Sequence, residues 1–112
     1  MRKGSFVAYI IDFESDAVED LKALRKGERV RVLTAIEEHL TYEPTRQSKS
    51  RIKHLRPGSQ PPYRLRIDTL RVYYDVRTDS KSVTIYGIVD KERSLEWLAA
   101  FAQKLAGKDE QP

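Results

Sequence analysis

The chain has 112 residues, of which 39% are hydrophobic and 34% are charged. This length predicts a single domain over residues 1–112, with a core from about residue 6 to 105 and a flexible tail over 107–112. The absence of cysteine excludes a disulfide scaffold, a thiolate nucleophile and any cysteine-ligated metal centre. No stretch is apolar over the roughly 18 residues of a membrane span, and the start lacks a secretory signal, so we expect a cytoplasmic protein without a membrane partner.

The first part of the chain predicts a strand and a helical hairpin. Residues 6–13 are rich in β-branched and aromatic side chains and are apolar at both parities, which indicates a strand buried on both faces. An apolar stripe at helical spacing follows, and Gly27 interrupts it. Ser15 or Asp16 is expected to cap this helix, with Glu19 at the capping-box position if Asp16 is the cap. A second stripe predicts a helix over residues 28–43 that ends at Pro44.

The second part of the chain predicts strands joined by short links. Residues 51–56 alternate in polarity, and a proline-rich loop separates them from residues 63–68, which alternate strictly. Residues 70–76 and 83–89 follow closely, so these last three runs are expected to form an antiparallel meander. Because strands joined by a helical crossover usually pair in parallel, the strand at residues 6–13 should lie beside residues 83–89.

The last predicted element is a helix over residues 94–105. Leu95, Leu98, Phe101 and Leu105 recur at helical spacing and should form its packing face. The predicted fold class is therefore α+β, in the order β-α-α-β-β-β(-β)-α. A mostly antiparallel sheet carries the N-terminal helical hairpin on one face, and a C-terminal helix closes the fold.

Positive charge is concentrated in the middle third of the chain. Residues 45–77 hold nine basic and two acidic side chains, whereas residues 12–44 hold nine acidic and five basic ones. Seven of the nine cations are arginine, whose planar guanidinium suits bidentate contact with phosphate. A solvated surface is the alternative explanation for such a run of charge.

Strand parity favours a binding site over a merely solvated surface. The predicted strands at 63–68 and 70–76 send Arg64, Arg66 and Arg71 to the exposed face opposite the core. Like charges side by side are unfavourable unless an anion spans them, which indicates a site for a polyanion. Tyr73 lies among these arginines and offers a stacking surface of the kind that binds bases of single-stranded RNA.

The order and spacing of several short motifs resemble the RelE toxins of bacterial type II toxin–antitoxin systems, within the RelE/ParE superfamily. Leu55-Arg56-Pro57-Gly58 precedes the alternating strand at residues 63–67, an Arg-Val-Tyr-Tyr strand follows at 71–74, and the last strand ends in Asp-Lys-Glu-Arg at 90–93. The resemblance covers nearly the whole chain, from about residue 6 to 105.

The resemblance implies a ribosome-dependent mRNA endoribonuclease, or mRNA interferase. Such an enzyme cuts mRNA in the ribosomal A site by attack of a ribose 2′-hydroxyl and thereby inhibits translation. It implies no metal and no cofactor. The implied partners are a RelB-like antitoxin, held in a toxin–antitoxin hetero-oligomer, together with mRNA and the 70S ribosome with its 16S rRNA.

The resemblance also implies roles for individual residues. The expected catalytic residues are Arg64, Arg66, Arg71, Arg56 and Lys91. The expected RNA- or ribosome-binding residues are Arg51, Lys53, Tyr73, Arg77, Arg93 and Trp97.

Two departures from the family bear on the mechanism. RelE proteins commonly carry lysines where this chain has Arg64 and Arg66, and arginine is a poor general base, so proton transfer falls mainly to Lys91. Trp97 stands where the family often has a tyrosine, and it can either stack on a base or pack in the core.

Two other functions remain open at this stage. One is a ParE-like inhibitor of DNA gyrase, and the other is a non-catalytic RNA-binding module. His39 is expected to be structural or exposed, and for His54 packing at the core edge is favoured over catalysis. No group of side chains has the spacing of metal ligands, and no glycine-rich phosphate loop occurs.

Overall fold

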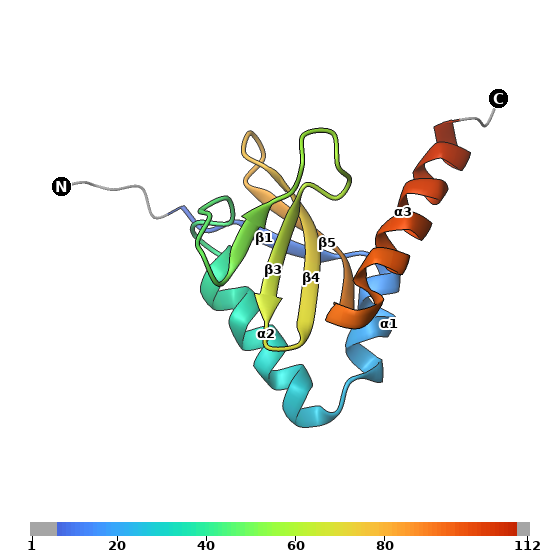
Figure 1. Cartoon of the computed structure of the whole chain (residues 1–112). Coiled ribbons are helices and arrows are strands. Elements are labelled where there is room, and N and C mark those ends of the chain that lie inside the picture. The colour runs from blue at the N-terminus through green and yellow to red at the C-terminus, as the bar shows by residue number, and fades with distance from the viewer. Residues whose placement is uncertain (1–6, 110–112) are drawn as a thin grey trace.

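The computed structural model describes residues 7–109, which form a twisted sheet with helices on both sides (Figure 1). The elements in chain order are β1 (Ile10–Phe13), α1 (Ser15–Ala23), α2 (Lys26–Leu40), β2 (Ile52–His54), β3 (Tyr63–Ile67), β4 (Leu70–Arg77), β5 (Ser82–Asp90), the 3₁₀ turn η1 (Lys91–Arg93) and α3 (Ser94–Asp109). The strand order in the sheet is β1-β5-β4-β3-β2, with β1 parallel to β5 and the other pairs antiparallel. The predicted α+β class and the meander β3-β4-β5 are confirmed.

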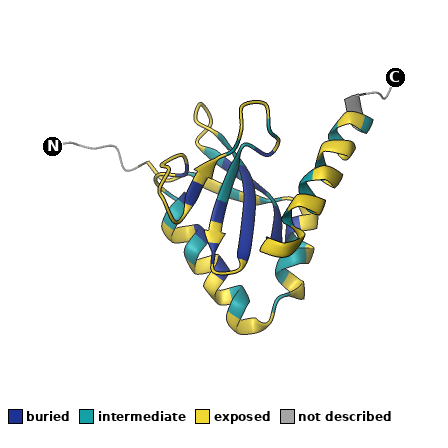
Figure 2. Cartoon of the chain, viewed as in Figure 1, coloured by how far each residue is buried: buried dark blue, intermediate teal, exposed yellow. Residues whose placement is uncertain are grey.

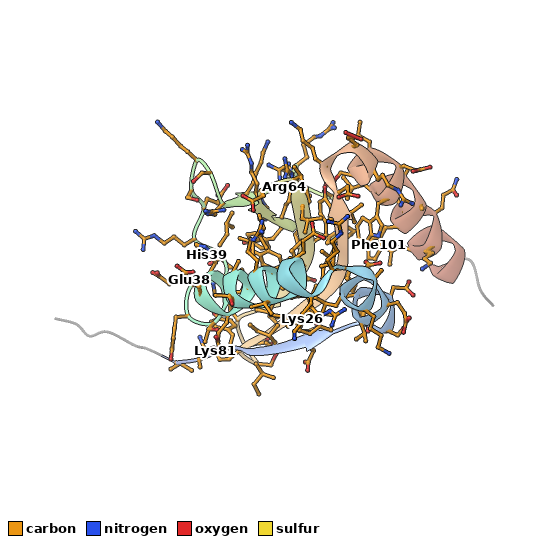
Figure 3. All side chains as sticks on the ribbon, turned by 90° about the horizontal axis from the view of Figure 1, so that it is seen from below. Lys26, Glu38, His39, Arg64, Lys81 and Phe101 are labelled. Carbon is orange, nitrogen blue, oxygen red and sulfur yellow. The ribbon has the colours of Figure 1, made fainter. Side chains whose placement is uncertain are left out.

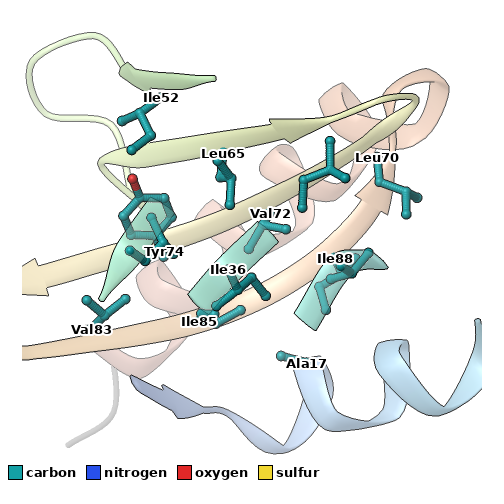
Figure 4. Packing of buried hydrophobic residues seen from close by; sticks show 13 residues of the cluster. Ala17, Ile36, Ile52, Leu65, Leu70, Val72, Tyr74, Val83, Ile85 and Ile88 are labelled. Atoms are coloured by element: carbon teal, nitrogen blue, oxygen red, sulfur yellow. The ribbon is translucent and has the colours of Figure 1, made fainter. Parts of the chain in front are cut away.

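One face of the sheet is apolar and is covered by α1 and α2. Alternation along β3 and β4 turns Leu65 and Val72 toward the helices, where both are fully buried. Figure 4 shows these side chains meeting Ile85 of β5, Ile36 of α2 and Ala17 of α1. Full burial of an aliphatic side chain stabilises a fold by about 1.5–3 kcal/mol, so this layer holds most of the stability. Figure 2 shows the buried residues concentrated in the central strands, whereas α3 is mostly exposed.

β1 lies at the edge of the sheet, in the parallel pairing with β5 that the crossover argument predicted. The prediction that this strand is buried on both faces was wrong. Ile10 is 66% exposed, and only the side that carries Ile11 and Phe13 packs against the core. Apolar residues at both odd and even positions of a strand are therefore not enough to show that both of its faces are buried. Phe6 lies outside the described residues.

Helix boundaries differ from the predicted ones where tertiary contacts decide them. α1 is capped by Glu14 without a side-chain hydrogen bond, so neither predicted capping residue, Ser15 or Asp16, is the cap. Asp16 instead pairs with Lys104 of α3 at 2.8 Å. α2 starts at residue 26, so Gly27 lies in its first turn. It ends at Leu40, three residues before the predicted end.

The C-terminal helix is longer than the predicted range 94–105. α3 continues through Asp109, so residues 107–109, which were expected to belong to the tail, have helical structure. Residues 110–112 lie outside the described part of the chain. Within residues 7–109 no helix is long and apolar enough to cross a membrane.

The turn between β3 and β4 is fixed by Asp68. This residue has φ 53°, a left-handed conformation that aspartate tolerates better than most residues. Its carboxylate accepts a hydrogen bond from Nη1 of Arg31 at 2.6 Å, which links the turn to α2. The hairpin that carries the three central arginines is thus fastened at its closed end.

We expect Tyr74→Phe to destabilise the fold by about 1 kcal/mol, within a range of roughly 0.5–1.5. The buried Tyr74 hydroxyl donates to the carbonyl of Pro44 at 2.7 Å and holds the loop after α2 against the sheet. Urea unfolding at pH 7 measures the loss. Tyr9→Phe is the matched control and should be neutral, since the Tyr9 hydroxyl has no hydrogen bond within residues 7–109. Equal stability of Tyr74→Phe and the parent would contradict the assignment.

The loss of stability caused by Tyr74→Phe should be smaller at alkaline pH. Burial, and after it the neighbouring Tyr63, raise the pKa of the Tyr74 phenol above its usual value. Above pH ~10 the unfolded phenol loses its proton while the folded one keeps it, so stability falls as the pH rises, by up to about 1.4 kcal/mol per pH unit. Phenylalanine lacks this proton, so the stability gap between parent and variant should shrink between pH 9 and pH ~11. A constant gap across that range would refute the explanation.

Candidate functional site

The face of the sheet opposite α1 and α2 carries a cluster of cations. Arg66 of β3 pairs with Arg71 of β4, and Arg64 lies between Lys53 of β2 and Tyr73 of β4. We call Arg64, Arg66 and Arg71 the cationic face. Figure 3 shows Arg64 on the far side of the sheet from α2, among several nitrogen-tipped side chains. The sheet thus brings together three of the expected catalytic residues, as strand parity predicted.

Arg71 is the buried member of the cationic face. It is 6% exposed, and its Nη1 donates to the carbonyls of Asp68 and Leu70, both at 3.1 Å. The expectation that it is exposed was wrong, because the guanidinium folds back onto the turn that precedes β4. Burial, followed by the charges of Arg64 and Arg66, lowers the pKa of Arg71. The cation is held in a fixed position at a cost in electrostatic free energy.

The electrostatic balance of the cationic face favours an anion. No carboxylate is among the charges that shift Arg71; its charged neighbours there are Arg64 and Arg66. Nε of Arg64 is buried and has no hydrogen-bond partner in the described part of the chain. A bound phosphate would supply acceptors and relieve the repulsion at once, through charge-assisted hydrogen bonds.

An aromatic stack covers the rest of this face and attaches α3 to it. The Trp97 ring lies parallel to Tyr73, with centroids 5.0 Å apart and planes 12° apart, and Phe101 stacks on Trp97 at 5.1 Å. Gly87 of β5 makes the approach possible, because a Cβ there would lie 2.4 Å from Trp97. Trp97, for which stacking and packing were both open, packs against the sheet.

This stack corrects two expectations. Tyr73 is 2% exposed beneath Trp97, so it does not present a free surface to a base. The predicted packing face of α3 was wrong at Leu95, which is 84% exposed. Phe101 does pack as predicted, but its partner in the contact is Trp97, which the prediction left off this face. A search for leucines at helical spacing could not reveal that a glycine on the sheet receives the tryptophan.

Two of the remaining expected residues lie near the cationic face. The Lys91 backbone N–H donates to the carbonyl of Thr69 at 2.7 Å, which fixes the start of η1 beside the turn between β3 and β4. Arg51 donates from Nη1 to the carbonyl of Arg66 at 3.1 Å, so its guanidinium lies against β3. The Lys91 side chain is exposed.

The others lie farther away or are engaged elsewhere. Arg77 is six residues beyond Arg71 on β4, roughly 20 Å along the strand, and contacts Asp79 at 3.9 Å. Arg93 contacts Glu96 at 4.0 Å. Arg56 is exposed in the loop between β2 and β3, and no hydrogen bond or ion pair in the described residues joins its side chain to the cationic face.

The two histidines lie outside the cationic face. His54 follows Lys53 on β2 and packs edge-on against Tyr63 at 4.7 Å, on the other side of the sheet. His39 is on α2. Residues 7–109 contain no group of three or more histidine, aspartate or glutamate side chains that could hold a metal ion.

Comparison with solved structures finds RelE proteins. The RelE–RelB complex from the archaeon Pyrococcus horikoshii matches with 28% identity and a TM-score of 0.64, over 77% of this chain and 98% of that one. The RelBE2 complex from Mycobacterium tuberculosis matches with 24% identity and a TM-score of 0.64, over 79% of this chain and 97% of that one. A mutant E. coli toxin RelE in the free state matches with 18% identity and a TM-score of 0.65, over 87% of this chain and 96% of that one. No family model and no curated protein matches. The chain has the fold of these toxins, and the resemblance to RelE is confirmed.

We expect Gly87→Ala to loosen α3, because the new methyl group would overlap the ring of Trp97. Trp97 is the sole tryptophan, so its emission should shift to longer wavelength as the ring becomes more solvated. Gly107→Ala is the control, since no atom lies within 4 Å of its added Cβ and alanine is the better helix former by about 1 kcal/mol. Unchanged emission in Gly87→Ala would contradict the packing of Trp97 on the sheet.

Proposed function

We propose that this chain, which has the RelE fold, is the toxin of a toxin–antitoxin pair and acts as a ribosome-dependent mRNA endoribonuclease. The observation that carries the proposal is the cationic face, where Arg64, Arg66 and Arg71 gather and no carboxylate is among the charges that act on the buried Arg71. A surface that merely keeps a protein soluble has no need to bury an arginine beside two others. A site that stabilises a phosphate as it gains negative charge does need such an arrangement.

The proposed reaction is an internal phosphoryl transfer in the mRNA. The ribose 2′-oxygen loses its proton and bonds to the adjacent phosphorus, while the bond from phosphorus to the 5′-oxygen breaks and the leaving 5′-oxygen takes up a proton, so that no net proton is gained or lost. The products are a 2′,3′-cyclic phosphate and a 5′-hydroxyl. Arg64 and Arg71 clamp the phosphate, whose charge rises in the transition state, and Arg66 lies opposite Arg71 on the same face.

Proton transfer is assigned to Lys91 in this proposal. Arginine remains protonated at neutral pH and serves as a clamp rather than as a base. The backbone of Lys91 is tied to Thr69, at the end of the hairpin that carries Arg71, so the exposed Lys91 side chain starts beside the site. Arg56 and Arg93 are proposed to contact RNA from the periphery, as is Arg77 from the far end of β4.

The proposed partner is an antitoxin of the RelB type. Neighbours in the comparison are RelE–RelB complexes, which supports this assignment. An acidic, amphipathic segment suits the cationic face, and the exposed Leu95 of α3 offers apolar surface close to it. Such a partner would cover the cations and keep the toxin inactive.

We expect Arg64→Ala and Arg71→Ala to abolish growth inhibition and to slow cleavage of ribosome-bound mRNA by about 30- to 1000-fold. The reason is the loss of one clamp on the transition state, worth roughly 2–4 kcal/mol. Primer extension on mRNA after brief induction measures the cuts. Thermal unfolding must accompany Arg71→Ala, since this arginine is buried and hydrogen-bonded.

The controls remove charge elsewhere. Arg25→Ala takes a cation from the exposed turn between α1 and α2, and His39→Ala alters α2, so both variants should remain toxic. If both arginine variants inhibit growth as strongly as the parent at equal expression, the site is assigned wrongly. DNA breaks that depend on gyrase, without cuts in mRNA, would favour a ParE-like inhibitor, and neither kind of damage would favour a simple RNA-binding module.

A further inference from the structure

A basic cavity adjoins the cationic face at the edge of the sheet. The loop before β2, together with β2 and β3, encloses about 330 Å³. Five cations line this edge pocket: Lys49, Arg51, Lys53, Arg64 and Arg66. Within the described chain no carboxylate lines it, so its chemistry calls for an anion.

The loop that walls the edge pocket is held by its own hydrogen bonds. Ser48 Oγ accepts from the backbone N–H groups of Arg51 at 3.0 Å and Ile52 at 3.4 Å. The side-chain oxygen of Gln47 accepts from the N–H of His54 at 3.1 Å. These contacts fasten the loop to β2, so the cations surround a formed cavity rather than extend from a loose segment.

The cations of the edge pocket lack acidic partners. Lys49 and Lys53 form no ion pair with any residue in the range 7–109, and the buried Nε of Arg64 has no acceptor. Arg46, which lies just before the pocket, differs because Glu43 neutralises it at 3.1 Å. In this part of the molecule the unpaired cations therefore line the concave side of the loop and strands β2 and β3.

We propose that the edge pocket binds a phosphodiester of the same RNA strand whose scissile phosphate lies on Arg64, Arg66 and Arg71. This inference rests on the proposed function, because it takes RNA to be the ligand of the cationic face. Arg64 and Arg66 line both regions, so a strand that crosses β4 and β3 meets the pocket next. From β4 to β2 is two strand spacings, roughly 10 Å, a span that a short stretch of single-stranded RNA bridges.

The lining favours a phosphodiester over an acidic peptide. Guanidinium, ammonium and hydroxyl donors converge on one concave site, which suits an anion with several acceptor oxygens. Ile52 is the apolar residue of the lining and is itself 3% exposed, so the pocket offers almost no apolar surface for the side chains of a peptide.

The test measures binding without cleavage. The probe is a labelled 2′-O-methyl RNA hexanucleotide, which cannot be cut because its 2′-oxygens are blocked. Fluorescence anisotropy across a range of low salt concentrations gives the affinity and its salt dependence. Replacing Lys49 and Lys53 together with alanine should lower the affinity roughly 10-fold and reduce the salt slope by about 0.7, the change for one phosphate in a single strand.

The matched control removes the same charge from the other side of the sheet. Lys22 is in α1 and Lys26 is in α2. Replacing both with alanine should change the affinity for the RNA hexanucleotide less than about 2-fold. If both double variants lose RNA affinity equally, the lysines act only through net charge, and the proposal is overturned. An unchanged RNA affinity in the pocket variant, or no RNA binding by the parent, would overturn it as well.

Two further arms separate the alternatives. If a hexaglutamate peptide loses affinity in the pocket variant while RNA does not, the pocket serves an acidic chain and the proposal is wrong. A parent protein that binds the hexanucleotide through the pocket but leaves ribosome-bound mRNA intact would refute the nuclease and leave the pocket standing. Cleavage by the parent with unchanged hexanucleotide binding in the pocket variant would refute the pocket alone.

Discussion

The alternation of side chains along β3 and β4 is the constraint on which the core and the site both depend. Every apolar residue that these strands send toward α1 and α2 obliges its neighbour to point to the opposite face. Leu65 lies between Arg64 and Arg66, and Val72 lies between Arg71 and Tyr73. Burial of the aliphatic residues therefore fixes the arginines side by side, although their charges repel. The core supplies the free energy that holds this unfavourable arrangement in place, and Arg71 is itself buried within it.

The position of α3 depends on a different kind of contact. Trp97 lies on Gly87 and Tyr73, so a missing side chain in β5 lets an aromatic ring reach the sheet. The ion pair between Lys104 and Asp16 is largely exposed and adds little to the attachment. The aromatic stack borders the cationic face and limits its extent on that side. The opposite border, at β2, is open and leads into the edge pocket.

The sequence was enough to predict the elements whose residue pattern fits only one structure. It was not enough where a contact from another element decides whether a residue is buried. Strict alternation made β3 and β4 predictable, and with them the shared face of Arg64, Arg66 and Arg71. The apolar run before α1 suits an edge strand as well as a central one, and the strand order that separates the two is a property of the whole sheet. The burial of Tyr73 depends on a glycine in another strand, and that of Arg71 on carbonyls in the turn before it. Neither is visible in the periodicity of β4.

The central claim is that this face holds an mRNA phosphate while the adjacent 2′-oxygen attacks it. Purified protein can be mixed with 70S ribosomes programmed with a defined mRNA, and the cut ends analysed, alongside an mRNA with a single 2′-deoxy substitution at the nucleotide that is cut. The account predicts a cut in the A-site codon that leaves a 2′,3′-cyclic phosphate, requires the ribosome and disappears with the 2′-deoxy substitution. Cleavage that persists without that 2′-hydroxyl, or no cleavage by the intact, folded protein on the ribosome, would contradict it.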